Sequence, residues 1–319
     1  MELFQIDEMG MVTEVRDVKE ANWVHLCQPT MEEINQLHDL YEMPKDYLTS
    51  VLDFQEISRI EGFYSEEKNK PKLVLMQFSE ETMSPSGFRQ IDTSPFSIIL
   101  VDNHLITAGD YTTTVLQKIV NQPSFNKRFE GVDFAKATML KICWYIAYQY
   151  NDQIRQLRDS IETLESELRV ATENEQLYQL MDTQKSLIFM IEALKQNVKV
   201  IEDLKQLTTF ATTSLEKELL RDVLVEFKQA HSSAETLLKV ASELGNMFSS
   251  IVSNNQNNVM KVLTSITIVL TVPTIVGGIY GMNVALPFAE SPFAFWFVSL
   301  LILLLSVIII WQLKKNKFF

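Results

Sequence analysis

The 319-residue sequence predicts an α+β cytoplasmic domain followed by a long helical stalk and two C-terminal transmembrane helices. The transmembrane helices are indicated by residues 262–280 and 293–311, two runs of 19 residues without a charge. At about 1.5 Å per residue each would form a helix about 28 Å long, close to the thickness of the hydrocarbon core of a bilayer. One such run alone would also be typical of a buried core helix, but two in tandem at the end of a polar chain favour membrane spans.

Residues 1–125 mix short alternating runs with one clear helix start, which indicates a compact α/β unit. Thr30 and Glu33 form a capping-box pattern, so a helix should begin here with Ile34, Leu37 and Leu40 on its apolar side. Asp102 and Asn103 are suited to a tight turn between two strands. The strands that we expect are residues 2–6, 11–16, 23–27, 73–78, 96–101 and 104–107.

Residues 124–272 contain no proline, which predicts helix almost throughout. One stretch has a heptad pattern typical of a helical hairpin or short coiled coil, formed by Ile154, Leu157, Ile161, Leu164 and Leu168. Thr213 and Glu216 provide a new helix cap. A helix from Ser214 through Pro273 to Tyr280 would have 67 residues and a length of about 100 Å.

Charge and motif content exclude several classes of function. Residues 1–258 hold 24 Lys and Arg but 40 Asp and Glu, a net charge of −16, so we expect no nucleic-acid partner. Such an acidic surface suits the attraction of cations, although simple solvation is its ordinary interpretation. The sequence also lacks a glycine-rich phosphate loop, a nucleophile elbow, an H-E-x-x-H helix and a paired C-x-x-C. We therefore expect neither a bound nucleotide nor an enzymatic activity.

The histidines give no metal site. His25 and Cys27 share one side of a predicted strand, but a third ligand is missing, so placement in the core or on the surface is favoured. His38, His104 and His231 are expected to be isolated surface residues.

The flanking charges set the expected topology. Lys261 precedes the first span, three lysines (Lys314, Lys315 and Lys317) follow the second, and the loop between the spans has no Lys or Arg. The positive-inside rule then places both termini in the cytoplasm of a cell membrane, which we expect to be bacterial. Residues 1–10 lack the pattern of a signal peptide. Cys27 and Cys143 should be reduced thiols.

The first span carries one distinctive face. Six residues follow one another at steps of three or four and so share one side of a helix: Met260, Leu263, Thr267, Thr271, Thr274 and Gly278. A stripe of hydroxyls in a membrane either bonds a neighbouring helix or lines water. Each threonine could also bond the preceding carbonyl of its own helix.

The first span ends in Tyr280-Gly281-Met282-Asn283, and a second span with a basic tail follows. This arrangement resembles the CorA family of divalent-cation channels. The resemblance extends back through Asn257, residues 259–264, Thr274 and Gly278, and more loosely to residues 23–34. For Gly281 and Asn283 an alternative interpretation is a helix C-cap in a left-handed conformation, and close helix packing explains the spacing of Gly277 and Gly281.

The resemblance implies a CorA-like fold and a homopentameric channel for divalent cations, most simply Mg²⁺ with Co²⁺ or Ni²⁺ as further ions. Gly281, Met282 and Asn283 would form the pore mouth. Thr267, Thr271, Thr274 and Gly278 would line the pore. Met260 and Leu263 would form a hydrophobic gate, and Asn257 an inner polar ring. Transport would be passive and driven by the membrane potential.

With this resemblance, six segments are expected. They are a cytoplasmic α/β domain (1–125), a helical region with the stalk helix (126–258), a pore-lining transmembrane helix (259–281), an external loop (282–292), a second transmembrane helix (293–313) and a basic cytoplasmic tail (314–319).

Two positions depart from the family pattern. Glu290 is the only charge of the external loop, where many members have an acidic segment. Asn246 stands where a regulatory Mg²⁺ ligand would align, and Glu243, one turn away, is a possible substitute. Two alternatives stay open: a zinc transporter of the ZntB type, and a membrane-tethered interaction or sensor domain without transport.

Overall fold

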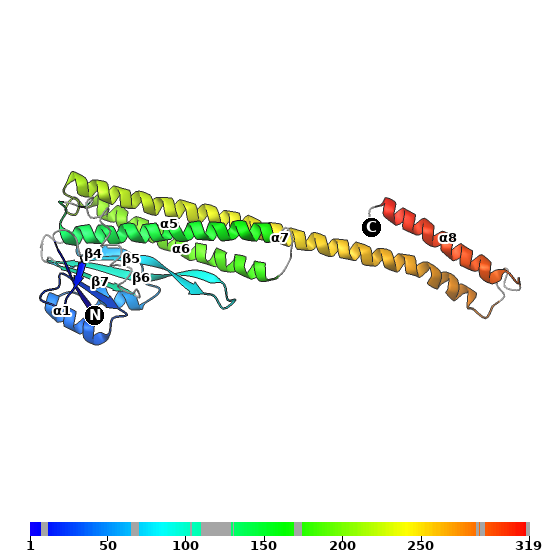
Figure 1. The fold of residues 1–319 in the computed structure, drawn as a ribbon, viewed down its shortest axis with the longest axis horizontal. Helices are drawn as coiled ribbons and strands as arrows, with labels where there is room; N and C mark the ends of the chain where they lie inside the picture. The colour runs from blue at the N-terminus through cyan, green and yellow to red at the C-terminus, as the bar shows by residue number, and fades with distance from the viewer. Residues whose placement is uncertain are drawn as a thin grey trace. The chain divides into compact units, whose positions relative to one another are not determined.

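The structure is a computed structural model that describes residues 1–7, 12–64, 70–102, 104–109, 129, 131–168, 174–284, 287 and 291–316, with the side chains of Leu168 and Asn174 left aside. It comprises two compact units, Met1–Gly245 and Asn246–Phe319. Figure 1 shows the elements coloured along the chain.

The first unit is built on a seven-stranded sheet in the order β2-β1-β3-β7-β6-β5-β4. Only the central pair, β3 and β7, is parallel, and the other neighbours are antiparallel. The strands are β1 (Glu2–Ile6), β2 (Val12–Glu14), β3 (Trp23–Cys27), β4 (Arg59–Glu61), β5 (Lys72–Met83), β6 (Arg89–Val101) and β7 (His104–Gly109).

One face of the sheet is covered by α1 (Met31–Tyr41), α2 (Asp46–Thr49) and the 3₁₀ turn η1 (Ser50–Leu52). The predicted capping box of α1 is confirmed, because Glu33 N–H donates to Thr30 Oγ1 and Thr30 N–H donates to the Glu33 carboxylate. Ile34 and Leu37 are fully buried in the core beneath the sheet, whereas Leu40 is exposed.

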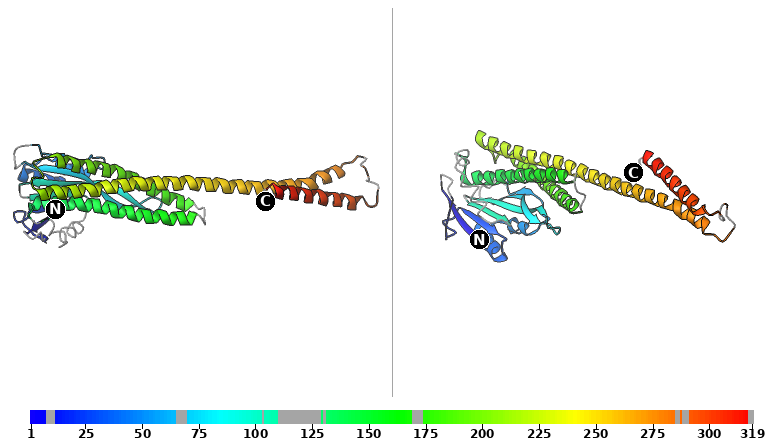
Figure 2. Two further views of the ribbon diagram at one scale, coloured as in Figure 1. Left: turned by 90° about the horizontal axis from the view of Figure 1, so that it is seen from above. Right: turned by 45° about the vertical axis from the view of Figure 1, so that its right-hand side comes forward.

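The other face carries the long helices α5 (Phe134–Leu168) and α6 (Asn174–Gln206), with the first part of α7 (Ser214–Tyr280) packed beside them (Figures 1 and 2). Cys143 of α5 lies 3.5 Å from the sulfur of Met76 on β5. Neither Cys27 nor Cys143 is in a disulfide, as predicted, and burial raises the pKa of Cys143 to about 12.

The heptad pattern of α5 is confirmed as a buried seam, since Ile154, Leu157, Ile161 and Leu164 are each at most 3% exposed. The part of α7 in this unit buries an apolar face, on which Leu220, Phe227, Ala230, Ala234 and Ala241 are fully buried. The predicted cap of α7 is also present: Glu216 N–H donates to Thr213 Oγ1, and Thr213 N–H donates to the Glu216 carboxylate.

The β5–β6 hairpin is longer than the sequence predicted, and β4 was not predicted at all. Polar residues and Pro95 interrupt the strand pattern of β6. Gln77, which pairs with Pro95, bonds Asn197 of α6 through both its backbone N–H and its C=O, at 2.8 and 2.6 Å. These groups therefore point away from β6, so Pro95 has no donor role toward β5. Two predicted positions, Met11 at the start of a strand and Asn103 in the turn between β6 and β7, lie outside the described residues. The other predicted turn residue, Asp102, has a positive φ of +49°, as a tight turn requires.

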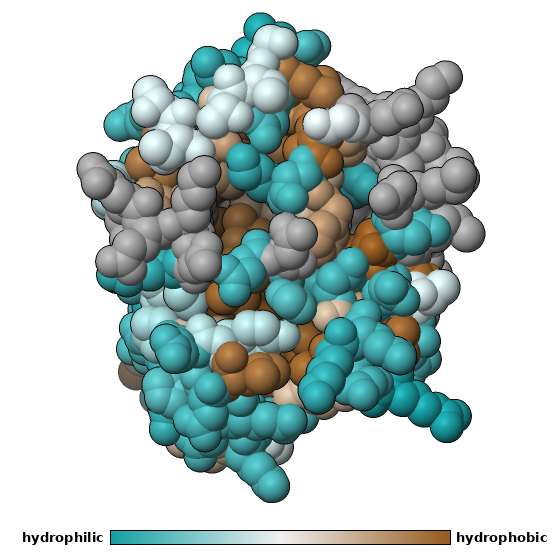
Figure 3. All heavy atoms as spheres, turned by 90° about the vertical axis from the view of Figure 1, so that its left-hand side faces the viewer, coloured by the Kyte–Doolittle hydropathy of each residue, from teal (hydrophilic) through white to brown (hydrophobic). Residues whose placement is uncertain are grey.

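Hydrophilic side chains cover much of the end of the first unit that Figure 3 shows, as expected for a domain in water.

The second unit contains the rest of α7 and α8 (Ala294–Lys315), which runs back alongside α7 (Figures 1 and 2). α7 has 67 residues and continues through Pro273, as predicted. Within the described residues, α7 and α8 are the two helices long and apolar enough to cross a membrane. Trp296 and Trp311 lie near the two ends of α8, the positions that aromatic side chains favour at membrane surfaces.

Candidate functional site

Exposure along α7 separates two opposite faces in the second unit. One face is buried or half-buried and adjoins α8; its residues are Ser265, Val269, Val272, Pro273, Val276 and Tyr280. The predicted stripe of Met260, Leu263, Thr267, Thr271, Thr274 and Gly278 is exposed throughout. At 100° per residue the two sets lie on opposite sides of the helix. The stripe is therefore one continuous face that α8 leaves uncovered.

The three threonines of the stripe all bond their own helix. Their Oγ1 atoms donate to the carbonyls four residues earlier, Thr267 to Leu263 at 2.9 Å, Thr271 to Thr267 at 2.7 Å and Thr274 to Leu270 at 2.9 Å. A hydroxyl has one proton and two lone pairs, so each oxygen keeps acceptor capacity on the exposed face. This stripe can accept hydrogen bonds from water, and the waters bound to a Mg²⁺ ion point their hydrogens outward.

Gly278 adds bare backbone to the same face, and a Cβ built on it would meet nothing within 4 Å. The same is true of Gly277. Close helix packing, the explanation offered for the spacing of Gly277 and Gly281, is therefore not made at Gly277 within the described chain, and packing against another copy of the chain stays a prediction.

α7 ends at Tyr280, and the predicted pore-mouth residues Gly281, Met282 and Asn283 follow it, all exposed. Gly281 N–H still donates to Gly277 O at 2.9 Å, and Met282 N–H donates to Ile279 O at 3.2 Å. The expected left-handed cap is wrong, since neither Gly281 nor Asn283 has a positive φ. The helix ends instead by tightening into an i to i−3 turn, which satisfies these amides without a reversal of the backbone.

Amide side chains gather at the other end of the stripe. Asn257 is exposed, and so are its neighbours Asn254, Asn255, Gln256 and Asn258. Gln256 and Asn257 lie four and three residues before Met260, so both border the stripe. The sequence alone led us to expect only Asn257 in a polar ring at the inner end of the pore. The run of five consecutive amide residues could also have identified Gln256 as a member of that ring.

The possible regulatory residues Glu243 and Asn246 are both exposed and lie three residues apart on α7. In the described parts of the chain no three His, Cys, Asp or Glu residues are grouped closely enough to hold a metal ion. Their regulatory role therefore stays a prediction. Glu290 and Lys317 lie outside the described residues.

His25 is fully buried, as a core residue should be, while Cys27 is exposed. The Nδ1 atom of His25 lies 2.9 Å from Thr107 Oγ1, which also accepts a 2.9 Å bond from the indole N–H of Trp23. This network joins β3 to β7 in the sheet.

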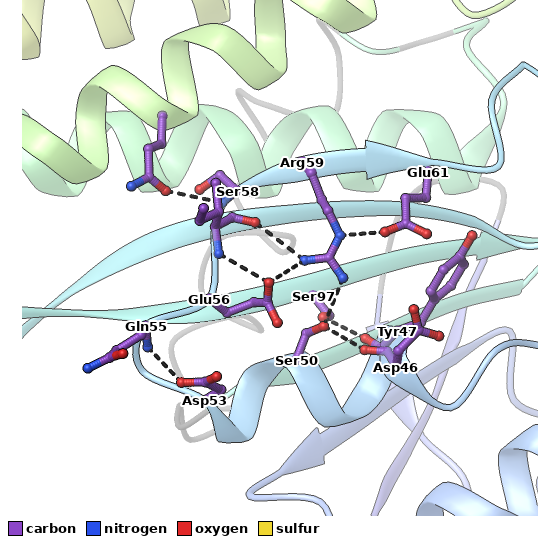
Figure 4. A network of polar contacts seen from close by, with 12 residues as sticks. Asp46, Tyr47, Ser50, Asp53, Gln55, Glu56, Ser58, Arg59, Glu61 and Ser97 are labelled. Atoms are coloured by element: carbon purple, nitrogen blue, oxygen red, sulfur yellow. Dashed lines mark hydrogen bonds and ion pairs between the residues drawn. The ribbon is translucent and has the colours of Figure 1, made fainter.

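An acidic cluster beside β4 surrounds the guanidinium of Arg59 (Figure 4). Arg59 bonds Glu56 at 2.7 Å and Ser50 Oγ at 3.1 Å, and it also bonds Glu61. The guanidinium stands where a metal ion would have to sit between these carboxylates. Burial, with the negative charges of Glu61 and Asp46, raises the pKa of the nearby Tyr47 to about 12.

Comparisons with known proteins agree with this architecture. A cobalt/magnesium transport protein CorA from Methanocaldococcus jannaschii is 26% identical over 302 residues, which are 92% of this chain and 90% of that protein. The complete structure of the CorA magnesium transporter from the same organism superimposes with a TM-score of 0.79 at 23% identity, over 100% of this chain and 98% of that one. The cytoplasmic domain of ZntB from Vibrio parahaemolyticus gives a TM-score of 0.54 at 15% identity, over 81% of this chain and 98% of that one.

The sequence profile of the family described as "CorA-like Mg2+ transporter protein" matches residues 18–315. The match includes the sheet, the long helices and both apolar helices. The chain therefore belongs to the family of CorA-like Mg²⁺ transporter proteins.

Proposed function

We propose that this chain is one subunit of a homopentameric channel that takes up Mg²⁺ passively, with Co²⁺ and Ni²⁺ as further ions. Family membership supports transport of a divalent cation, and the relative from M. jannaschii is named for cobalt and magnesium. One α7–α8 pair cannot enclose water, so several copies must contribute the exposed stripe. The observation that carries the proposal is the stripe itself, an uncovered face with three hydroxyls in the apolar segment of α7.

In this assembly α7 lines the pore and α8 faces lipid. Asn283 would ring the outer mouth with its side-chain amide, together with Gly281 and Met282. Mg²⁺ releases its waters reluctantly, so a mouth that binds the hydrated ion suits it better than a dry cage. The threonine oxygens, with their protons already donated to the backbone, would then accept hydrogen bonds from the ion's waters.

Met260 and Leu263 form the gate in this proposal. Their side chains are 58% and 56% exposed in the single chain, so they are free to meet their copies around a five-fold axis. Neither offers an oxygen to water. A ring of such side chains closes a pore by excluding water from it. Gln256 and Asn257, just below the gate, would form a polar ring that bonds the ion's waters at the inner exit.

The proposed topology keeps residues 1–258 and the basic tail in the cytoplasm and residues 282–292 outside. Lys261 and Lys314 at the ends of the apolar segments support it through the positive-inside rule. A negative membrane potential then drives each elementary charge inward with about 2.3 kcal/mol per 100 mV.

Flux into liposomes tests the proposal. The purified protein should carry Mg²⁺ down an imposed negative potential, and native mass spectrometry should give five copies. A ZntB-like zinc transporter would instead favour Zn²⁺ in the same assay. Zn²⁺ flux should be measured as well because the chain is similar in structure to the ZntB cytoplasmic domain. A membrane tether would carry neither ion.

A further inference from the structure

A groove lies between α7 and α8, and none of its lining residues belongs to the exposed stripe. It has a volume of about 380 Å³, in the range of small-molecule sites, and is lined by Ile266, Val269, Leu270, Ile310 and Lys314. Four of these five residues are aliphatic. Lys314 is the exception, and it lies in the last turn of α8.

We propose that this groove binds an anionic phospholipid, with an acyl chain between the two helices and the phosphate on Lys314. Both helices are apolar enough to lie in a membrane, so the groove meets acyl chains rather than water. Lys314 supplies the one charge, at the rim. A basic residue at the membrane surface beside an apolar cleft is the arrangement that binds acidic lipid head groups.

Position along α8 supports the same ligand. Trp311 follows the groove residue Ile310, and its ring lies 5.4 Å from the ammonium of Lys315. Tryptophan rings of this kind mark the level of lipid head groups. Lys314 is three residues further on, so its ammonium can reach a phosphate while its methylene stem stays in the apolar region. The inference rests on the membrane location of α7 and α8 and not on the transported ion.

Tryptophan quenching by brominated lipids measures this binding in the full-length protein. Trp23 is buried in the sheet domain and Trp144 lies on α5, so only Trp296 and Trp311 meet the bilayer. In the Trp296→Phe background Trp311 alone reports lipid. Brominated phosphatidylglycerol and brominated phosphatidylcholine are compared, each relative to the same variant in lipid without bromine.

We expect phosphatidylglycerol to bind near Trp311 about fivefold more tightly than phosphatidylcholine, the preference that one lysine gives at an anionic surface. Lys314→Gln should reduce this ratio to about one. Val269→Phe, or Val269→Leu if the larger change impairs expression, should do the same by filling the groove while the charge stays. The matched control is Lys315→Gln, which removes a neighbouring charge that does not line the groove and should keep the preference.

Three results would overturn the proposal. Equal quenching by the two lipids in the parent would remove the preference altogether. An equal loss in Lys314→Gln and Lys315→Gln would assign it to general surface charge. No quenching of Trp311 by either lipid would mean that a second copy of the chain covers this face. None of these results bears on ion flux, so the proposed channel is tested separately.

Discussion

Thr271 Oγ1 donates a 2.7 Å hydrogen bond to the carbonyl of Thr267, and Thr267 makes the same bond to Leu263. Each hydroxyl proton is thus committed to the helix, and the oxygens of the stripe are left as acceptors. A cation site that handles hydrated ions needs acceptors and is harmed by free donors. A threonine hydroxyl in a helix often bonds its own backbone simply because no water is near. In this stripe the same bond fixes each hydroxyl so that the exposed face offers hydrogen-bond acceptors.

Replacing Thr271 with Val keeps the shape of the side chain but removes this acceptor. Each lost hydrogen bond is worth about 1 kcal/mol, and every subunit of a ring loses one, so Mg²⁺ uptake should fall by about tenfold or more. Radioactive or dye-reported flux into liposomes measures it. Ser265→Ala is the matched control: Ser265 Oγ makes the same bond, to Lys261 O at 2.7 Å, but is fully buried on the opposite face. If both variants transport at the parent rate, the stripe does not line the pore.

Leu263→Asn should act in the opposite direction. The amide gives water partners within the proposed gate, so the cost of wetting the constriction falls and basal uptake should rise by about tenfold. Electrophysiology at low cytoplasmic Mg²⁺ separates this from a change in regulation. Val262→Asn places the same amide at the same level but about 100° around α7 from Leu263, off the stripe, and it should leave conductance unchanged. A Leu263→Asn protein that conducts like the parent would assign the gate elsewhere.

Much of the fold was predictable because local signals agree with long-range packing. The capping residues Thr30 and Thr213 begin helices where expected, and the absence of proline allowed α7 to be predicted from Ser214 to Tyr280. The apolar runs gave both membrane helices. The stripe followed from spacing alone, since a helix period places those six residues on one side whatever lies around them.

The remaining features depend on partners distant in sequence. The part of the β5–β6 hairpin beyond the predicted strands carries Glu80, Glu81 and Pro95. Where this part begins, Asn197 of α6 bonds the backbone of Gln77, the partner of Pro95, from 120 residues away. No local pattern encodes that contact. The end of α7 at Tyr280 was predicted correctly, but the alternative interpretation of Gly281 as a left-handed cap is wrong, because the amides of Gly281 and Met282 bond carbonyls of the last turn.

Asn283→Ala tests the proposed mouth. Its side chain is exposed just beyond the end of α7, so the substitution should leave folding and assembly intact while it removes the amide that meets the hydrated ion. We expect Mg²⁺ uptake to fall to the level of empty liposomes. Val284→Ala, one residue further and also exposed, is the control and should transport normally. Parent-like uptake by Asn283→Ala would exclude Asn283 from the ion path.

The start of α7 should respond to acid through Glu216. Burial alone would raise the pKa of this carboxyl. The backbone N–H groups of Thr213 and Thr212 and the Thr212 hydroxyl all donate hydrogen bonds to it, and the ammonium of Lys136 lies 3.3 Å away; together these lower its pKa to about 2. The ordinary value is 4.5, so the folded state binds this proton less tightly than the unfolded chain. The stabilisation is therefore complete above about pH 4.5 and is lost as the pH falls from there toward about 2.

Glu216→Gln isolates this contribution. At neutral pH the variant should be less stable than the parent by about 1 kcal/mol, the usual value of a helix cap, and the difference should shrink as the pH falls toward 2. Thermal unfolding followed by circular dichroism at several pH values measures both proteins. Glu218→Gln, two residues further and exposed, should match the parent at every pH. A difference between Glu216→Gln and the parent that stays constant down to pH 2 would show that the carboxylate charge does not hold the start of α7.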